Sequence, residues 1–125
     1  MATTEHRVLN QPKMIFSVPD ELWEMKAGEQ WKTSHRGAKT LVKNDALRIV
    51  LVALTRGMRV EEHKAEGAIA VSVVEGSVRF TANGEDSVLT TGALLTLAGG
   101  IPHAVEALEE SAFVVTVVQP HQAGG

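Results

Sequence analysis

From residue 38 onward the chain is a series of short segments rich in Val, Ile, Leu and Thr, separated by Gly, Asn and Asp. This pattern is typical of an all-β domain with frequent turns. The junctions Asn44-Asp45, Glu75-Gly76, Asn83-Gly84 and Gly99-Gly100 supply residues that tolerate a positive φ. The segments predict strands over residues 39–43, 47–55, 58–63, 69–75, 77–82, 86–90, 93–97, 103–108 and 112–118.

Two of these segments, residues 47–54 and 113–118, are apolar on both faces and do not alternate with polar positions. A strand of this kind has to be covered on both sides. We expect one side to be covered by the N-terminal segment with Trp23 and Trp31, or by a homodimer interface, and both arrangements are compatible with each other.

The N-terminal part carries one helix signal, in which Ser17 precedes Pro19 and acidic residues and predicts a short helical turn over residues 17–25. Both ends of the chain are polar or glycine-rich and are expected to be loosely held. The predicted organisation is one domain without repeat or linker. Its parts are an N-terminal extension packing on the barrel over residues 1–37, a β-barrel over 38–119 and a flexible tail over 120–125.

Composition excludes several classes of function. Twelve basic and fifteen acidic residues give a formal charge of −3, and the basic residues are scattered, so we expect no nucleic-acid partner. The apolar runs are far shorter than the ~20 residues of a membrane-spanning helix, so we expect no membrane association. The chain has no cysteine and no signal-peptide pattern, which favours the reducing cytoplasm.

Two glycine and histidine patterns carry the candidate chemistry. Their members are, in order, Gly57, His63 and Gly76, then Gly92, Gly100 and His103. Together they resemble the two motifs of small single-domain cupins, whose fold is a double-stranded β-helix, or jelly roll, closed into a barrel. The resemblance covers about residues 57–107, and it implies an all-β, RmlC-like cupin barrel with a short N-terminal extension.

The cupin motifs provide three histidines and one glutamate as metal ligands, but this chain has Ala65 in place of a histidine and Ile69 in place of the glutamate. Only His63 and His103 remain. Catalytic zinc usually keeps three protein ligands, so we expect an incomplete site that holds a divalent metal (Fe, Mn, Ni or Zn) weakly at most.

The neighbours of His63 do not complete the ligand set in this interpretation. Glu62 and Lys64 are out of phase with His63 along the strand and are expected to face away from it. His35 lies on the loop 33–37, which is expected to be able to lap over the barrel mouth, and it is the best candidate from outside the motifs.

The favoured interpretation is a cupin of undetermined biochemical role that binds a small molecule in the barrel without a complete metal site. Two alternatives stay open: a metal-dependent cupin enzyme of dioxygenase or isomerase type with a ligand from outside the motifs, and a structural or interaction module with a filled barrel. No catalytic residue can be assigned. By strand phase from the histidines, the expected pocket residues are His63, His103, Ala65, Ile69, Val71, Val78, Phe80, Leu95, Leu97 and Val105.

Overall fold

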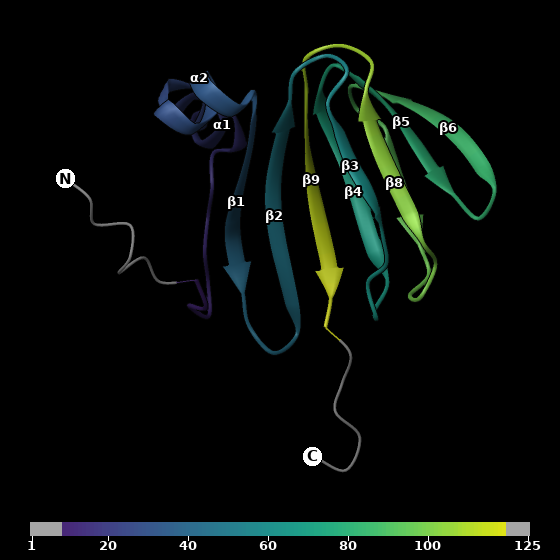
Figure 1. The fold of residues 1–125 in the computed structure, drawn as a ribbon. Coiled ribbons are helices and arrows are strands. Elements are labelled where there is room, and N and C mark those ends of the chain that lie inside the picture. The colour runs from purple at the N-terminus through teal and green to yellow at the C-terminus, as the bar shows by residue number, and fades with distance from the viewer. Residues whose placement is uncertain (1–8, 120–125) are drawn as a thin grey trace.

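The computed structural model describes residues 9–119, and within them the strands form two antiparallel sheets (Figure 1). One sheet has the order β1-β2-β9-β4-β7 and the other has the order β3-β8-β5-β6. The strands are β1 (Arg36–Lys43), β2 (Leu47–Leu54), β3 (Arg59–His63), β4 (Ile69–Glu75), β5 (Ser77–Ala82), β6 (Glu85–Thr90), β7 (Leu94–Leu97), β8 (His103–Ala107) and β9 (Ser111–Val118). The predicted all-β jelly roll is confirmed.

Each predicted strand is present, and the bounds differ by a few residues at most. The largest difference is at β1, which was predicted to begin at residue 39 but begins at Arg36. Its first residues pair with the end of β2, where Arg36 lies opposite Leu54. The turn between these two strands is closed by Asn44, whose Oδ1 accepts hydrogen bonds from the backbone N–H groups of Ala46 and Leu47. The side chain of Asn44 thus supplies turn chemistry of the expected kind.

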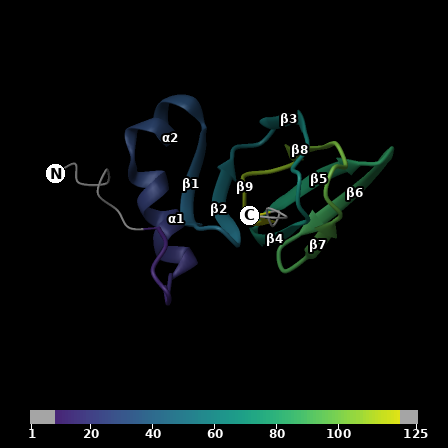
Figure 2. The same ribbon diagram turned by 90° about the horizontal axis from the view of Figure 1, so that it is seen from below.

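The two sheets enclose the main core, and the N-terminal segment encloses a second one. In Figure 2 the helices α1 and α2 lie on one side of β1 and β2, while β3, β8, β5 and β6 lie on the other side. The core between the sheets consists of Leu54, Ile69, Val71, Val73, Val78, Phe80, Val105, Ala107 and Phe113. The core beneath the helices consists of Leu22, Leu41, Val42, Leu51, Ala53 and Ala112.

The apolar outer face of β2 and β9 is therefore covered by the N-terminal segment of the same chain, which was one of the two expected arrangements. Trp31 packs against this second core, but Trp23 is 77% exposed and points away from it, so the assignment of Trp23 to the cover was wrong. The helical phase decides this, since Leu22 occupies the buried side of α1. The homodimer interface stays a prediction, which light scattering on the purified protein tests.

Helix α1 (Val18–Ala27) begins where the sequence predicts, with Ser17 as its N-cap. The Ser17 hydroxyl accepts a hydrogen bond from the backbone N–H of Asp20, which satisfies one of the donors left free at a helix start. A second helix, α2 (Glu29–Ser34), follows after Gly28 and was not predicted. In the described part of the chain, no helix is long and apolar enough to span a membrane.

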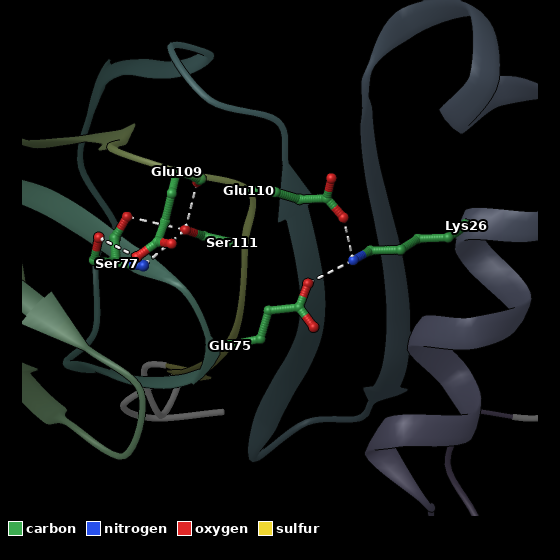
Figure 3. Close-up of polar contacts among 6 residues, drawn as sticks. All are labelled: Lys26, Glu75, Ser77, Glu109, Glu110 and Ser111. Atoms are coloured by element: carbon green, nitrogen blue, oxygen red, sulfur yellow. Dashed lines mark hydrogen bonds and ion pairs between the residues drawn. The ribbon is translucent and has the colours of Figure 1, made fainter.

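Lys26 fixes α1 to the barrel by reaching two carboxylates on different turns (Figure 3). Its ammonium lies 2.5 Å from a carboxylate oxygen of Glu75, at the end of β4, and 2.6 Å from one of Glu110, just before β9. Burial disfavours the charged form of Lys26, but the hydrogen bonds to Glu110 and Glu75 outweigh it and raise the pKa of this group above its ordinary value. The contact joins the helix to both sheet turns at this end of the barrel.

The same two turns are joined to each other by buried serine contacts (Figure 3). Ser111 is fully buried, and its hydroxyl oxygen accepts a hydrogen bond from the backbone N–H of Ser77. Gly76 lies directly beside this contact with φ +83°, and a Cβ there would be 2.3 Å from both the Ser111 hydroxyl and the carbonyl oxygen of Glu110. The position therefore requires glycine for its backbone conformation and for its space.

Candidate binding site

A cavity of about 240 Å³ opens between the two sheets, at the end of the barrel where β2 begins and β9 ends. Most of its wall is aliphatic or aromatic, and the inward-facing residues of β2, β9 and β4 form one side. The lining consists of Arg48, Val50, Val52, Val60, His63, Lys64, Ala65, Ile69, Val71, Phe80, His103, Val105, Phe113, Val115 and Val117.

His63 and His103 lie next to each other on this wall. They are directly opposite in the pairing of β3 with β8, and their ring centroids are 4.4 Å apart at an interplanar angle of 60°. The ring of His103 also stacks on Phe80, with centroids 5.6 Å apart and planes 10° from parallel. His103 is 5% exposed, whereas His63 lies at the exposed side of the pair.

Both imidazoles are oriented by the same backbone contact. Nδ1 of His63 lies 2.9 Å from the carbonyl oxygen of Glu61, and Nδ1 of His103 lies 3.0 Å from the carbonyl oxygen of Ile101. A carbonyl oxygen only accepts, so Nδ1 donates in both cases and the neutral rings carry their free lone pair on Nε2. The pair therefore presents two hydrogen-bond acceptors that differ in their exposure to solvent.

Nε2 of His103 is open to the cavity. This nitrogen makes no hydrogen bond with residues 9–119. Within the same range, every side-chain nitrogen or oxygen that is fully buried does have a hydrogen-bond partner. This nitrogen must therefore reach accessible space, and the cavity is the space that His103 lines. A ligand or a water molecule in the cavity can hydrogen-bond to it.

A β-bulge in β3 changes which side chains reach the cavity. Val60 pairs with Val105 and His63 with His103, so the chain advances by three residues on β3 for two on β8. Such a bulge leaves one residue unpaired and shifts the alternation of the strand. The expectation that Lys64 faces away from His63 was wrong, because Lys64 follows the end of β3 and lines the same cavity.

Arg48 is a charged lining residue that the sequence analysis did not assign to the pocket, as it also did not assign Val50, Val52, Val60, Phe113, Val115 and Val117. It shares the inward phase of Val50 and Val52 on β2, and it lies at the exposed rim of the cavity. Its signal is visible in the sequence: it is a single charge on the inward-facing side of a strand that is otherwise apolar on that side.

The structure brings most of the expected pocket residues together and places three elsewhere. Around the cavity are His63, His103, Ala65, Ile69, Val71, Phe80 and Val105. Val78 is fully buried in the core. Leu95 and Leu97 lie on β7, at the edge of the five-stranded sheet, and line a separate hollow of about 200 Å³. Phe80 lines both this hollow and the cavity.

His35 does not lie over the cavity. It caps the end of α2 in a left-handed conformation with φ 64°, and it adjoins the end of β1 that pairs with Leu54. The cavity is at the opposite end of β2, near Arg48. The expectation that the loop 33–37 laps over the barrel mouth was therefore wrong.

The residues present do not fit a cupin metal centre. Among residues 9–119, no three side chains of His, Cys, Asp or Glu gather closely enough to hold a metal ion. Ala65 and Ile69 line the cavity at the two positions where the motif carries further ligands, and no acidic side chain is part of the lining. Two imidazoles without a carboxylate fall short of the three protein ligands that catalytic sites usually have.

Neither a family model nor a curated protein matches the sequence. Solved structures do match. A protein of unknown function from Streptococcus pyogenes is 19% identical with a TM-score of 0.71, over 94% of this chain and 99% of the other. A cupin superfamily protein from Desulfitobacterium hafniense is 16% identical with a TM-score of 0.71, over 90% of this chain and 95% of the other. The chain has the cupin fold.

The cupin fold occurs in proteins of diverse role, as a third similar structure illustrates. Salicylate 1,2-dioxygenase from Pseudoaminobacter salicylatoxidans is 14% identical with a TM-score of 0.75, and this chain covers 36% of its length. Likeness at this level of identity concerns the fold alone. The cupin fold that the glycine and histidine motifs implied is confirmed, and the biochemical role of this chain has to be argued from its own cavity.

Proposed function

We propose that this cupin binds a small, largely apolar molecule inside its barrel, without a tightly held metal ion. The cavity lined by His63 and His103 carries this proposal, since eleven of its fifteen lining residues are Val, Ile, Ala or Phe. Its volume of about 240 Å³ lies below the range of roughly 300–1,000 Å³ typical for drug-sized ligands, which favours a smaller molecule. The space also argues against a barrel filled by side chains.

The absence of cysteine suits a protein that acts in the reducing cytoplasm.

The apolar lining provides affinity by burial, and the two Nε2 atoms provide hydrogen-bond acceptors that orient the bound molecule. No reaction is part of this proposal, because the cavity lining contains no Ser, Thr or Cys as a nucleophile and no Asp or Glu to pair with the histidines.

Amide NMR of the labelled full chain with cyclohexanol, a neutral apolar probe, tests the proposal. We expect saturable shifts at cavity residues such as Val71 and Val105, and their loss in Val115→Phe, which fills the space. Val88→Phe on the outer face of β6 is the matched control, because Val88 is 59% exposed and does not line the cavity. Wild-type protein without saturable shifts contradicts the proposal.

Metal analysis of protein purified without an affinity tag tests the second part of the proposal, that the barrel holds no tightly bound metal ion. We expect no stoichiometric Fe, Mn, Ni or Zn. A near-stoichiometric metal that is lost in His63→Ala or His103→Ala contradicts the metal-free proposal and favours the metal-dependent enzyme.

A further inference from the structure

The charged residues of the cavity have one sign. Arg48 and Lys64 are both part of the lining, and no Asp or Glu is. Within residues 9–119, neither cation forms an ion pair with a carboxylate, whereas Lys26, Lys39, Arg59 and Arg79 do. The chain as a whole has a formal charge of −3, so the positive lining is a local feature of the barrel mouth.

Arg48 stands in the same cross-strand row as the position that lost its carboxylate. Arg48 pairs with Val117 across β2 and β9, and Val117 pairs with Ile69 across β9 and β4. Directly paired residues in adjacent strands face the same way, so all three side chains point into the barrel at one level, with Arg48 and Ile69 about 10 Å apart. A cation has thus been placed in the row where a glutamate would hold a metal.

We propose that the ligand of this cupin is a small carboxylate with an apolar body, whose carboxylate is held at the barrel mouth by Arg48, with support from Lys64. This rests on the proposed function and names the chemistry of its ligand. Arginine suits the role because its planar guanidinium presents several N–H donors to a carboxylate. The apolar body fills the space between the sheets, where Val71, Phe113 and Val115 form the wall.

The same charges make the cavity a poor place for a divalent cation. Two positive side chains and no carboxylate oppose the binding of a metal, in addition to the missing ligands at positions 65 and 69. The loss of the metal ligands and the gain of Arg48 are therefore consistent with one change, from a cation site to an anion site.

Calorimetric or NMR titration with cyclohexanecarboxylate and its neutral isostere cyclohexanecarboxamide, at low ionic strength, tests this inference. We expect the carboxylate to bind the wild-type protein about three- to tenfold more tightly than the amide, a modest factor because Arg48 is solvent-exposed. Arg48→Gln should remove most of this preference, because it weakens the binding of the carboxylate more than that of the amide. Lys64→Gln should reduce the preference by a smaller factor.

Arg56→Gln is the matched control, since Arg56 is exposed in the turn after β2 and does not line the cavity. Equal binding of the two probes, or an equal effect of Arg56→Gln and Arg48→Gln, overturns the inference while the proposed function stands. If neither probe binds, the proposed function fails with it. Circular dichroism of each variant confirms that the barrel is folded.

Discussion

His63 and His103 are cross-strand partners whose rings are oriented by one repeated contact, from Nδ1 to the carbonyl oxygen two residues earlier in the chain. This repetition has a spectroscopic consequence. We expect both neutral rings to be the tautomer with the proton on Nδ1, and nitrogen-detected NMR of the imidazoles distinguishes the two tautomers directly. His35, whose ring makes no hydrogen bond with residues 9–119, is the internal reference. A proton on Nε2 of either ring would contradict the geometry of the pair.

The motif positions predict a gain of function. Ala65→His with Ile69→Glu should create a metal site with an affinity for Zn²⁺ tighter than about 1 µM, because it completes four ligands on residues that already line the cavity. Without metal, the variant should lose about 3 kcal/mol of stability, since Ile69 is only 5% exposed and a carboxylate replaces its buried side chain. Metal titration followed by thermal unfolding measures both effects.

The control for this design is the same double variant with His63→Ala, which should bind far more weakly. A folded double variant that gains no metal affinity would show that the motif has been aligned incorrectly. Arg48 remains in the cavity in either case, and Arg48→Gln should raise the affinity of the double variant for Zn²⁺ further by removing a positive charge.

The Lys26 contact predicts a loss of stability on substitution. Lys26→Met should lower the free energy of unfolding by about 1 kcal/mol, because it leaves Glu75 and Glu110 without their shared cation. Lys32→Met, at an exposed position in α2 without an ion pair in the described part of the chain, should change it little. Urea denaturation of the three proteins measures the difference.

The raised pKa of Lys26 fixes the direction of its pH dependence. A pKa that is higher in the folded than in the unfolded protein contributes stability below the unfolded value of 10.5, and this contribution is lost as the pH rises through the folded pKa. We therefore expect the stability difference between wild type and Lys26→Met to persist at neutral pH and to shrink above about pH 10.5. A difference that grows in strong alkali would contradict the assignment.

Gly76 and Gly84 form a matched pair for backbone effects. Both have a positive φ, but a Cβ at Gly76 meets Ser111 and Glu110 at 2.3 Å, whereas nothing lies within 4 Å at Gly84. We expect Gly76→Ala to cost about 3 kcal/mol and Gly84→Ala about 1 kcal/mol. Equal costs at the two sites would show that backbone strain alone decides, and that the close approach of the two turns does not.

The strands could be predicted from the sequence because their apolar segments and turn residues are local signals. Asn44 and Gly76 end strands where the pattern indicated, and Ser17 caps α1. Helix α2 was missed because it is short and has no side chain that caps its start. Trp23 was misplaced because a hydrophobic residue carries no sign of which helix face will be covered.

The site was harder to predict because it depends on strand phase. Alternation counted outward from His63 assigns Lys64 to the outer face, but β3 ends at His63, so the count does not extend to Lys64. Arg48 lines the same cavity as His63 because the fold brings β2 and β3, which belong to different sheets, to opposite sides of it. No local pattern encodes it.

The contacts of Lys26, Gly76 and Ser111 lie at one end of the barrel, and the cavity mouth with Arg48 lies at the other. This separation makes the mouth free to diverge. Residues that line the cavity, such as those at positions 65 and 69, can be changed while the turns that hold the sheets together are left intact. The buried turns would then determine the stability of this barrel, and the residues at the mouth would determine what it binds.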